Sequence, residues 1–179
     1  NGQTKDGVWI DGVISGKTKI HYNNGEYYGY LLNGKPNQHG VISFSNGSKY
    51  DGSWENGFFS GQGEYVDANK DSIFGEWRNG LLNGYAEIIS KKSSCYGIFE
   101  QGKLNGNGYS IYPDSSIYSG HFVDNNKEGY GDLFFNSKDL YQGEWKEDKF
   151  HGIGFYNFSN GDSYIGSWYN GIQNGTGTI

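Results

Sequence analysis

The chain has 179 residues, of which 34% are hydrophobic, 18% are aromatic and 31 are glycine, and its formal charge is -6. So few aliphatic side chains argue against an ordinary globular core, whereas aromatic rings bury enough area each to hold a thin structure together. The acidic balance and the scattered basic residues, with Lys91 and Lys92 as the one adjacent pair, exclude a nucleic-acid partner.

A short motif recurs along the whole chain. It reads YDGSW at residue 50, and related copies begin at residues 5, 27, 73, 95, 118, 141 and 164, at intervals of 22 or 23 residues. A fixed period of this length is typical of a repeat protein. We therefore predict eight repeats, preceded by a leader or by the end of an earlier repeat at 1–4. The repeats span 5–26, 27–49, 50–72, 73–94, 95–117, 118–140, 141–163 and a truncated 164–179.

Each repeat reads as a β-hairpin. Tyr50, Gly52 and Trp54 alternate with polar residues, as on one face of a strand, and Asn56-Gly57 is a strong hairpin-turn signal. A second turn, such as Asn46-Gly47 or Asn160-Gly161, leads into the next repeat. No segment reads as a helix. The predicted fold is all-β: an elongated, twisted, single-layer antiparallel sheet of consecutive hairpins.

The regular glycines need a reason, because a strand glycine costs about 0.5–1 kcal/mol relative to alanine. We predict that Gly52, Gly61 and Gly63 let a Tyr or Trp ring lie flat on the bare backbone. Asn125 and Asp148 replace the turn glycine in two repeats. Since Asn and Asp tolerate positive φ, these replacements fit the same turn.

Residues 50–63 match the pattern Y-x-G-x-W-x-x-G-x-x-x-G-x-G at every marked position. The pattern resembles the MORN (membrane occupation and recognition nexus) repeat, and the resemblance covers 5–179. It implies an elongated ribbon with a groove. Proteins with such repeats include junctophilins, plant phosphatidylinositol phosphate kinases and ciliary radial-spoke components. A chain made almost only of repeats is most similar to the apicomplexan and other protist cytoskeletal scaffold proteins.

The resemblance implies a non-enzymatic scaffold for homo-oligomerisation and protein–protein interaction, in cytoskeletal or cortical membrane-associated assemblies such as those of cell division. We expect a homodimer through the carboxy-terminal repeats. Its predicted interface comprises Trp145, Tyr164, Trp168 and Ile179. A groove for cytoskeletal or cortical partner proteins is predicted from Tyr50, Trp54, Tyr65, Trp77, Tyr118, Phe122 and Tyr141. The lone cysteine excludes an internal disulfide and indicates a reducing, cytoplasmic compartment.

The alternative is a peripheral membrane module that binds anionic phospholipids or phosphoinositides. Such binding usually needs clustered Lys or Arg, which the sequence lacks, so direct lipid binding is not favoured. No apolar run approaches the roughly 18 residues of a membrane span, which predicts a soluble or at most peripheral protein. A second apolar face is predicted from Tyr30, Phe58, Leu81, Tyr109, Phe134, Phe155 and Tyr169, which fall outside the inward positions.

No cofactor and no catalytic group is predicted. Residues 12–18 (GVISGKT) fall one position short of a phosphate-binding loop, and the repeat explains both of their glycines. The candidate metal ligands are His39, Cys95, His121 and His151, none of them paired at ligand spacing. No zinc site is therefore expected within one chain, although one assembled across a two-fold axis stays open.

Overall fold

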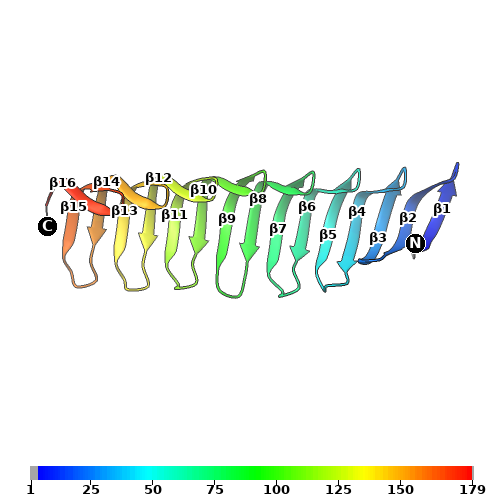
Figure 1. Ribbon diagram of the computed structural model, residues 1–179, viewed down its shortest axis with the longest axis horizontal. Helices are drawn as coiled ribbons and strands as arrows, with labels where there is room; N and C mark the ends of the chain where they lie inside the picture. The colour runs from blue at the N-terminus through cyan, green and yellow to red at the C-terminus, as the bar shows by residue number, and fades with distance from the viewer. Residues whose placement is uncertain (1–3, 179) are drawn as a thin grey trace. The chain divides into compact units, whose positions relative to one another are not determined.

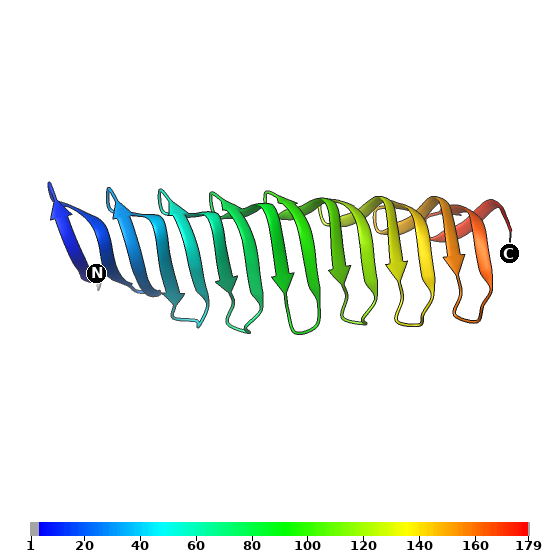
Figure 2. The same ribbon diagram turned by 180° about the vertical axis from the view of Figure 1, so that it is seen from behind.

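The protein is described here by a computed structural model, which describes residues 4–178. It comprises two compact units, one ending at Ser90 and the other beginning at Lys91, called here the first and second unit. Within each unit, consecutive strands pair antiparallel in chain order (Figures 1 and 2). Every regular element among the described residues is a strand. The predicted all-β fold of consecutive hairpins is confirmed.

The strands come in pairs, one pair to each predicted repeat. Those of the first unit are β1 (Thr4–Ile10), β2 (Val13–Tyr22), β3 (Gly25–Leu32), β4 (Lys35–Phe44), β5 (Lys49–Glu55), β6 (Phe58–Val66), β7 (Ser72–Arg78) and β8 (Leu81–Ile89). Those of the second unit are β9 (Ser94–Glu100), β10 (Lys103–Ile111), β11 (Ile117–Val123), β12 (Asn126–Phe134), β13 (Leu140–Lys146), β14 (Lys149–Asn157), β15 (Ser163–Tyr169) and β16 (Ile172–Thr178).

A two-residue turn closes each hairpin. Asn56 and Gly57 have φ values of 52° and 91°, which is the type I′ geometry that suits the twist of a hairpin. Asn125 and Asp148 adopt φ values of 72° and 65° at the second turn position, as predicted. The turn also contacts the preceding repeat, because the amide of Gly57 donates to the carbonyl of Pro36 at 2.9 Å. Such a turn is therefore both a hairpin closure and a link between repeats.

From β4 onward, loops of four or five residues join one hairpin to the next, whereas two residues join β2 to β3. In the loop that follows β4, the amide of Phe44 donates to the carbonyl of Ser48 at 2.8 Å, and Gly47 has a φ of 88°. The side chain of Asn46 accepts hydrogen bonds from the amide and the hydroxyl of Ser48, at 2.9 and 2.7 Å. The predicted second turn is confirmed here and after β14, where Gly161 has a φ of 97°.

Glycines hold the aromatic core in place. Tyr50 is fully buried, and a Cβ added at Gly63 would lie 2.5 Å from its Cζ atom. Tyr118 is seated in the same way on Gly131. The prediction that bare backbone seats a ring is therefore confirmed for Gly63. The prediction is wrong for Gly61, because a Cβ added there would meet the side chain of Ser53 and not a ring. At this position it is the positive φ of 62° that favours glycine.

The seated tyrosines also compensate for a break in the sheet. The pairing of β5 with β6 shifts between Gly52 and Trp54, which leaves the Ser53 carbonyl free for another donor. The hydroxyl of Tyr50 donates to that carbonyl at 3.0 Å. Burial, and secondarily the charge of Asp51, raises the pKa of Tyr50 to about 12, so the hydroxyl keeps its proton.

Tryptophans connect one repeat to the repeat before it. The indole nitrogen of Trp54 donates to the carbonyl of Gly40 at 2.9 Å, and that of Trp145 donates to Gly131 at 2.9 Å. The Trp54 ring also meets Tyr27 and Tyr50 edge to face, with ring centroids 5.4 Å apart in both pairs. The core of each unit is thus a row of rings in which buried Tyr hydroxyls and Trp indole nitrogens donate to backbone carbonyls.

Candidate functional site

One position in the second strand of each repeat determines which side chain packs next to the buried aromatic rings. It lies opposite the Trp position of the first strand, and we call it the filling position. Its residues are Ile14, Pro36, Phe59, Leu82, Leu104, Lys127, Phe150 and Gln173. Phe59 stacks on Tyr50 with ring centroids 3.6 Å apart, and Phe150 stacks on Tyr141 at 3.8 Å. Where Pro36 and Lys127 stand, no such ring covers the tyrosine.

Pro36 leaves a hollow in the first unit, which we call the first notch. Its volume is about 260 Å³. It is lined by Tyr22, Asn24, Tyr27, Pro36, Ile42, Trp54 and Gly57. Tyr22, Pro36 and Ile42 are half-buried, whereas Tyr27 and Trp54 form its floor and are buried. None of these lining residues carries a charge.

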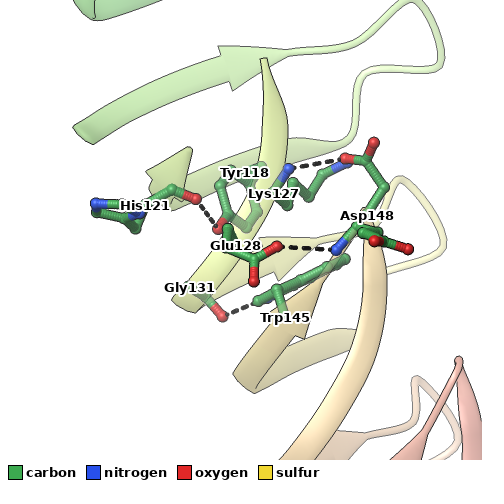
Figure 3. Close-up of polar contacts among 8 residues, drawn as sticks. Tyr118, His121, Lys127, Glu128, Gly131, Trp145 and Asp148 are labelled. Atoms are coloured by element: carbon green, nitrogen blue, oxygen red, sulfur yellow. Dashed lines mark hydrogen bonds and ion pairs between the residues drawn. The ribbon is translucent and has the colours of Figure 1, made fainter. Parts of the chain in front are cut away.

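Lys127 occupies the matching place in the second unit, which we call the second notch. Its ammonium nitrogen lies 4.8 Å from the ring centroid of Tyr112, 5.6 Å from that of Tyr118 and 5.4 Å from that of Trp145. Its side chain is only 14% exposed. A cation above several rings is attracted by their negative faces, by about 0.5–2 kcal/mol. The chain therefore places one of its own ammonium groups inside an aromatic cage, and Figure 3 shows Lys127 beside two of the three residues, Tyr118 and Trp145.

Asp148 completes this cage. One of its carboxylate oxygens accepts from the backbone amide of Lys127 at 2.9 Å and pairs with the ammonium at 3.2 Å, as Figure 3 shows. The carboxylate of Glu128 accepts from the amide of Glu147 beside it, at 3.0 Å. Asp148 stands at the turn position that glycine takes in most repeats, so its side chain adds a negative charge which Gly57 does not supply in the first notch. Asn125 uses the same position to accept from the amide of Leu104 at 2.8 Å.

A wider hollow of about 340 Å³ lies beside Lys127. Tyr112, Pro113, Asp114, Ser116, Lys127, Leu133 and Phe135 line it. The hydroxyl and amide of Ser116 donate to one carboxylate oxygen of Asp114, at 2.6 and 2.9 Å, and these bonds lower the pKa of that carboxyl. The hollow is therefore bordered by a stable negative charge as well as by the half-buried ring of Tyr112.

The residues predicted to line a partner groove lie mostly inside the row of rings. Tyr50, Tyr118 and Tyr141 are fully buried; Phe122, Trp54 and Trp77 are 2%, 7% and 9% exposed; and Tyr65 is half-buried. Trp54 borders the first notch, and Tyr118 borders the cage around Lys127. The others contribute to the core and offer little side-chain surface to a partner.

Tyr22, Pro36, Tyr112 and Lys127 are the residues that the sequence analysis missed. A signal for two of them exists, because an alignment of the repeats shows Pro36 and Lys127 where most other repeats carry Phe, Leu or Ile. Tyr22 and Tyr112 each precede the first residue of a repeat by a loop, and no motif marks them.

The residues predicted for a dimer interface are also largely internal. Trp145, Tyr164 and Trp168 are 4%, 6% and 7% exposed, and the indole of Trp168 donates to the carbonyl of Gly154 at 3.3 Å. Ile179 lies outside the described residues. Exposed apolar surface near these repeats comes instead from Tyr169 and Ile172.

The second apolar face predicted from the sequence is largely present. Tyr30, Phe58, Leu81, Phe134 and Tyr169 are all exposed, whereas Tyr109 and Phe155 are half-buried. Tyr109 stacks on Tyr96 with ring centroids 4.9 Å apart. In each unit, side chains from more than one hairpin thus contribute exposed apolar area.

The candidate metal ligands are divided between the two units, with His39 in the first and Cys95, His121 and His151 in the second. His39 belongs to the first unit, where its ring nitrogen lies 3.3 Å from Asp51. In the second unit, His151 lies 5.3 Å from the ring of Tyr169, and burial raises the pKa of Cys95. Residues 4–178 contain no group of three or more side chains that could hold a metal ion.

The segment that resembles a phosphate-binding loop is part of the first hairpin. Gly12 closes the turn between β1 and β2, and Gly16 lies within β2 with a φ of 81°. The ammonium of Lys17 lies over the ring of Tyr28, 5.1 Å from its centroid. In the described part of the chain, no helix is long and apolar enough to cross a membrane.

Comparisons with known proteins agree with this fold. The MORN repeat matches residues 27–49, 50–72, 74–92, 95–117, 118–139, 141–163 and 164–179. The first hairpin lies outside these matches, although the structure gives it the same turn. Over 105 residues, the chain is 30% identical to alsin from Rattus norvegicus and from Homo sapiens; the match covers 59% of this chain but only 5% of alsin.

Two solved structures are similar in fold. The TCP domain of SAS-4 from Drosophila melanogaster, solved in complex with a proline-rich motif of Ana2, has a TM-score of 0.50 at 14% identity, covering 92% of this chain and 90% of that one. The TCP10 domain of Danio rerio CPAP, solved with a STIL peptide, has a TM-score of 0.41 at 12% identity, covering 92% and 84%. The hairpins, the seated rings and the seven matched segments together show that the chain belongs to the MORN-repeat family.

Proposed function

We propose that this chain is a non-enzymatic scaffold that binds extended segments of partner proteins at notches in its row of rings. The observation that carries the proposal is the first notch, a hollow of about 260 Å³ that lies beside Pro36 and Tyr22, over the buried rings of Tyr27 and Trp54. In two other repeats the ring of Phe59 or Phe150 occupies the filling position instead. An uncharged, ring-lined hollow at the surface is suited to a side chain from another protein.

The repeat architecture supports this proposal. Hairpins that pair in series present the same surface again and again, which suits a long segment better than a compact ligand. A domain of similar fold, that of Drosophila SAS-4, was solved with a bound proline-rich motif. Aromatic-lined grooves commonly take such extended segments, whose conformation is already restricted before binding. We expect the partner segment of this chain to be extended as well.

A peptide selection tests the proposal. Random peptides displayed on phage would be selected against the whole chain, and the enriched peptides would then be measured against two variants. Tyr22→Ala removes a ring from the first notch and should weaken binding by at least tenfold. Tyr85→Ala removes an exposed ring from β8, away from the notch, and should leave binding unchanged. Enriched peptides that ignore Tyr22→Ala, or the absence of any enriched peptide, would contradict the proposal.

Self-association through the carboxy-terminal repeats is a second candidate function. Tyr169 and Ile172 flank the last hairpin turn and are 58% and 69% exposed, which favours an apolar contact there. Trp145, Tyr164 and Trp168 would support this contact from below, since they are buried. We expect the chain to be a dimer by light scattering, and Ile172→Asp to convert it to a monomer. The matched control is Ile153→Asp, at another exposed isoleucine, in β14, which should remain dimeric. A monomeric wild type would rule out this contact.

The setting we propose is a cytoskeletal or cortical membrane-associated assembly, in which the chain connects protein partners. Direct binding of anionic lipids is not favoured, because the chain is acidic and its basic residues are scattered. Sedimentation with phosphoinositide vesicles separates the two possibilities. The scaffold proposal expects no pelleting above that with neutral vesicles.

A further inference from the structure

The two notches have the same geometry in their respective units. Tyr27 and Trp54 meet edge to face with ring centroids 5.4 Å apart at 84°, and Tyr118 and Trp145 do so with centroids 5.2 Å apart, also at 84°. Tyr22 and Tyr112 are the third ring in each notch. The two notches thus differ chiefly at the filling position and at the turn.

The second notch shows what such a set of rings can hold. There, the ammonium of Lys127 lies within 5.6 Å of three ring centroids and its side chain is mostly buried. The first notch presents the matching rings with no cation among its lining residues. The side chain of Pro36 has no charged group that could lie above these rings.

From this comparison we propose that the first notch binds a lysine side chain of an extended partner segment, and that Lys127 is a built-in occupant of the corresponding rings in the second notch. The inference rests on the proposed function and names the side chain that the partner contributes. Charge favours a cationic partner, because the formal charge of the chain is -6. The size of the hollow suits one side chain, since it lies below the roughly 300–1,000 Å³ of typical small-molecule pockets.

Three variants follow from the internal template. Pro36→Lys gives the first notch the residue that the second notch already accommodates, so its ammonium should take the place of the partner's lysine. Pro36→Ala leaves the rings open and should retain binding. In the second unit, Lys127→Ala removes the occupant but keeps the rings and Asp148. That variant should gain a second site, and this site should bind more tightly than the first because a carboxylate borders it.

Nuclear magnetic resonance of the whole chain with two synthetic peptides tests the inference. One peptide is acetyl-Pro-Pro-Lys-Pro-Pro-amide, and the other replaces lysine with norleucine, which has an apolar chain in place of the charged one. The indole N–H signals of Trp54 and Trp145 report the two notches separately. We expect the lysine peptide to shift the Trp54 signal and to bind about threefold to thirtyfold more tightly than the norleucine peptide.

The variants then decide where the peptide binds. The shift at Trp54 should vanish in Pro36→Lys and persist in Pro36→Ala, and Lys127→Ala should add a shift at Trp145. Equal affinity of both peptides at Trp54 would overturn the lysine preference while leaving the scaffold function intact. If neither peptide shifts Trp54 while peptides from the phage selection do, the lysine inference fails alone. If none shifts it, the notch fails as a binding site altogether.

Discussion

Substitution of Gly63 tests the packing on which the whole fold depends. In Gly63→Ala, the new Cβ would lie 2.5 Å from Cζ and 2.7 Å from Cε2 of Tyr50, distances that require the ring to move. Tyr50 is fully buried, stacks on Phe59 and donates to the carbonyl of Ser53, so little space exists for it to move into.

The size of the effect follows from what the ring would lose. Exposing a large side chain costs about 1.5–3 kcal/mol, losing an aromatic stack about 0.5–1.5 kcal/mol, and losing a hydrogen bond about 1 kcal/mol. Alanine restores about 0.5–1 kcal/mol, because it is less flexible than glycine in a strand. We therefore expect the free energy of unfolding to fall by about 2–5 kcal/mol, measured by urea unfolding followed through tryptophan fluorescence.

Two controls separate ring displacement from other effects. The first control is Gly47→Ala, at a loop glycine where an added Cβ would meet open space but where φ is 88°. This substitution should lower the free energy of unfolding by about 1–2 kcal/mol, which is the cost of the unfavourable backbone conformation alone. In a Tyr50→Ala background, Gly63→Ala should have no further cost, because the ring is gone. If Gly63→Ala were within 0.5 kcal/mol of wild type, or equally costly without Tyr50, the seating argument would be refuted.

Three further predictions concern the buried tyrosines, the turns and the links between repeats. Because burial raises the pKa of Tyr50 to about 12, its contribution to stability is complete below pH 10 and declines as the pH rises from 10 towards 12; unfolding curves across this range should show a smaller decline in Tyr50→Phe, and an equal decline would contradict the assignment. Gln101 has a φ of 49° at a turn position that is Asn in four other repeats. Because Asn tolerates this conformation better, Gln101→Asn should raise the free energy of unfolding by about 0.5–1 kcal/mol. A lower melting temperature of the variant would contradict this prediction. Trp54→Phe removes the hydrogen bond to Gly40 and should cost about 1–2 kcal/mol in urea unfolding; no loss would show that the indole nitrogen does not link the repeats.

The repeat, the hairpins and the turns could be predicted because they depend on local chemistry. Asn125 and Asp148 show this well: the repeat alignment indicates a turn, and the tolerance of Asn and Asp for positive φ explains their presence. The seating of Tyr50 on Gly63 could also be predicted, since only a missing Cβ makes room for a ring.

The accessibility of the rings could not be predicted in the same way. Alternation shows that Tyr50 and Trp54 share a face, but not that the next repeat covers this face. The hydrogen bond from Trp54 to the preceding repeat draws the hairpins together and buries both rings. The cage around Lys127 was missed for a related reason, because its three rings come from separate segments.

Hydrogen exchange with a selected peptide bound tests most directly whether the first notch is the binding surface. Exchange of backbone amides would be compared, by mass spectrometry, between the free chain and the complex. The account predicts slower exchange around Tyr22, Asn24 and residues 37–42, and unchanged exchange in β8. Slower exchange confined to the opposite, solvent-facing side of the sheet, around Phe74 and Tyr85, would contradict it.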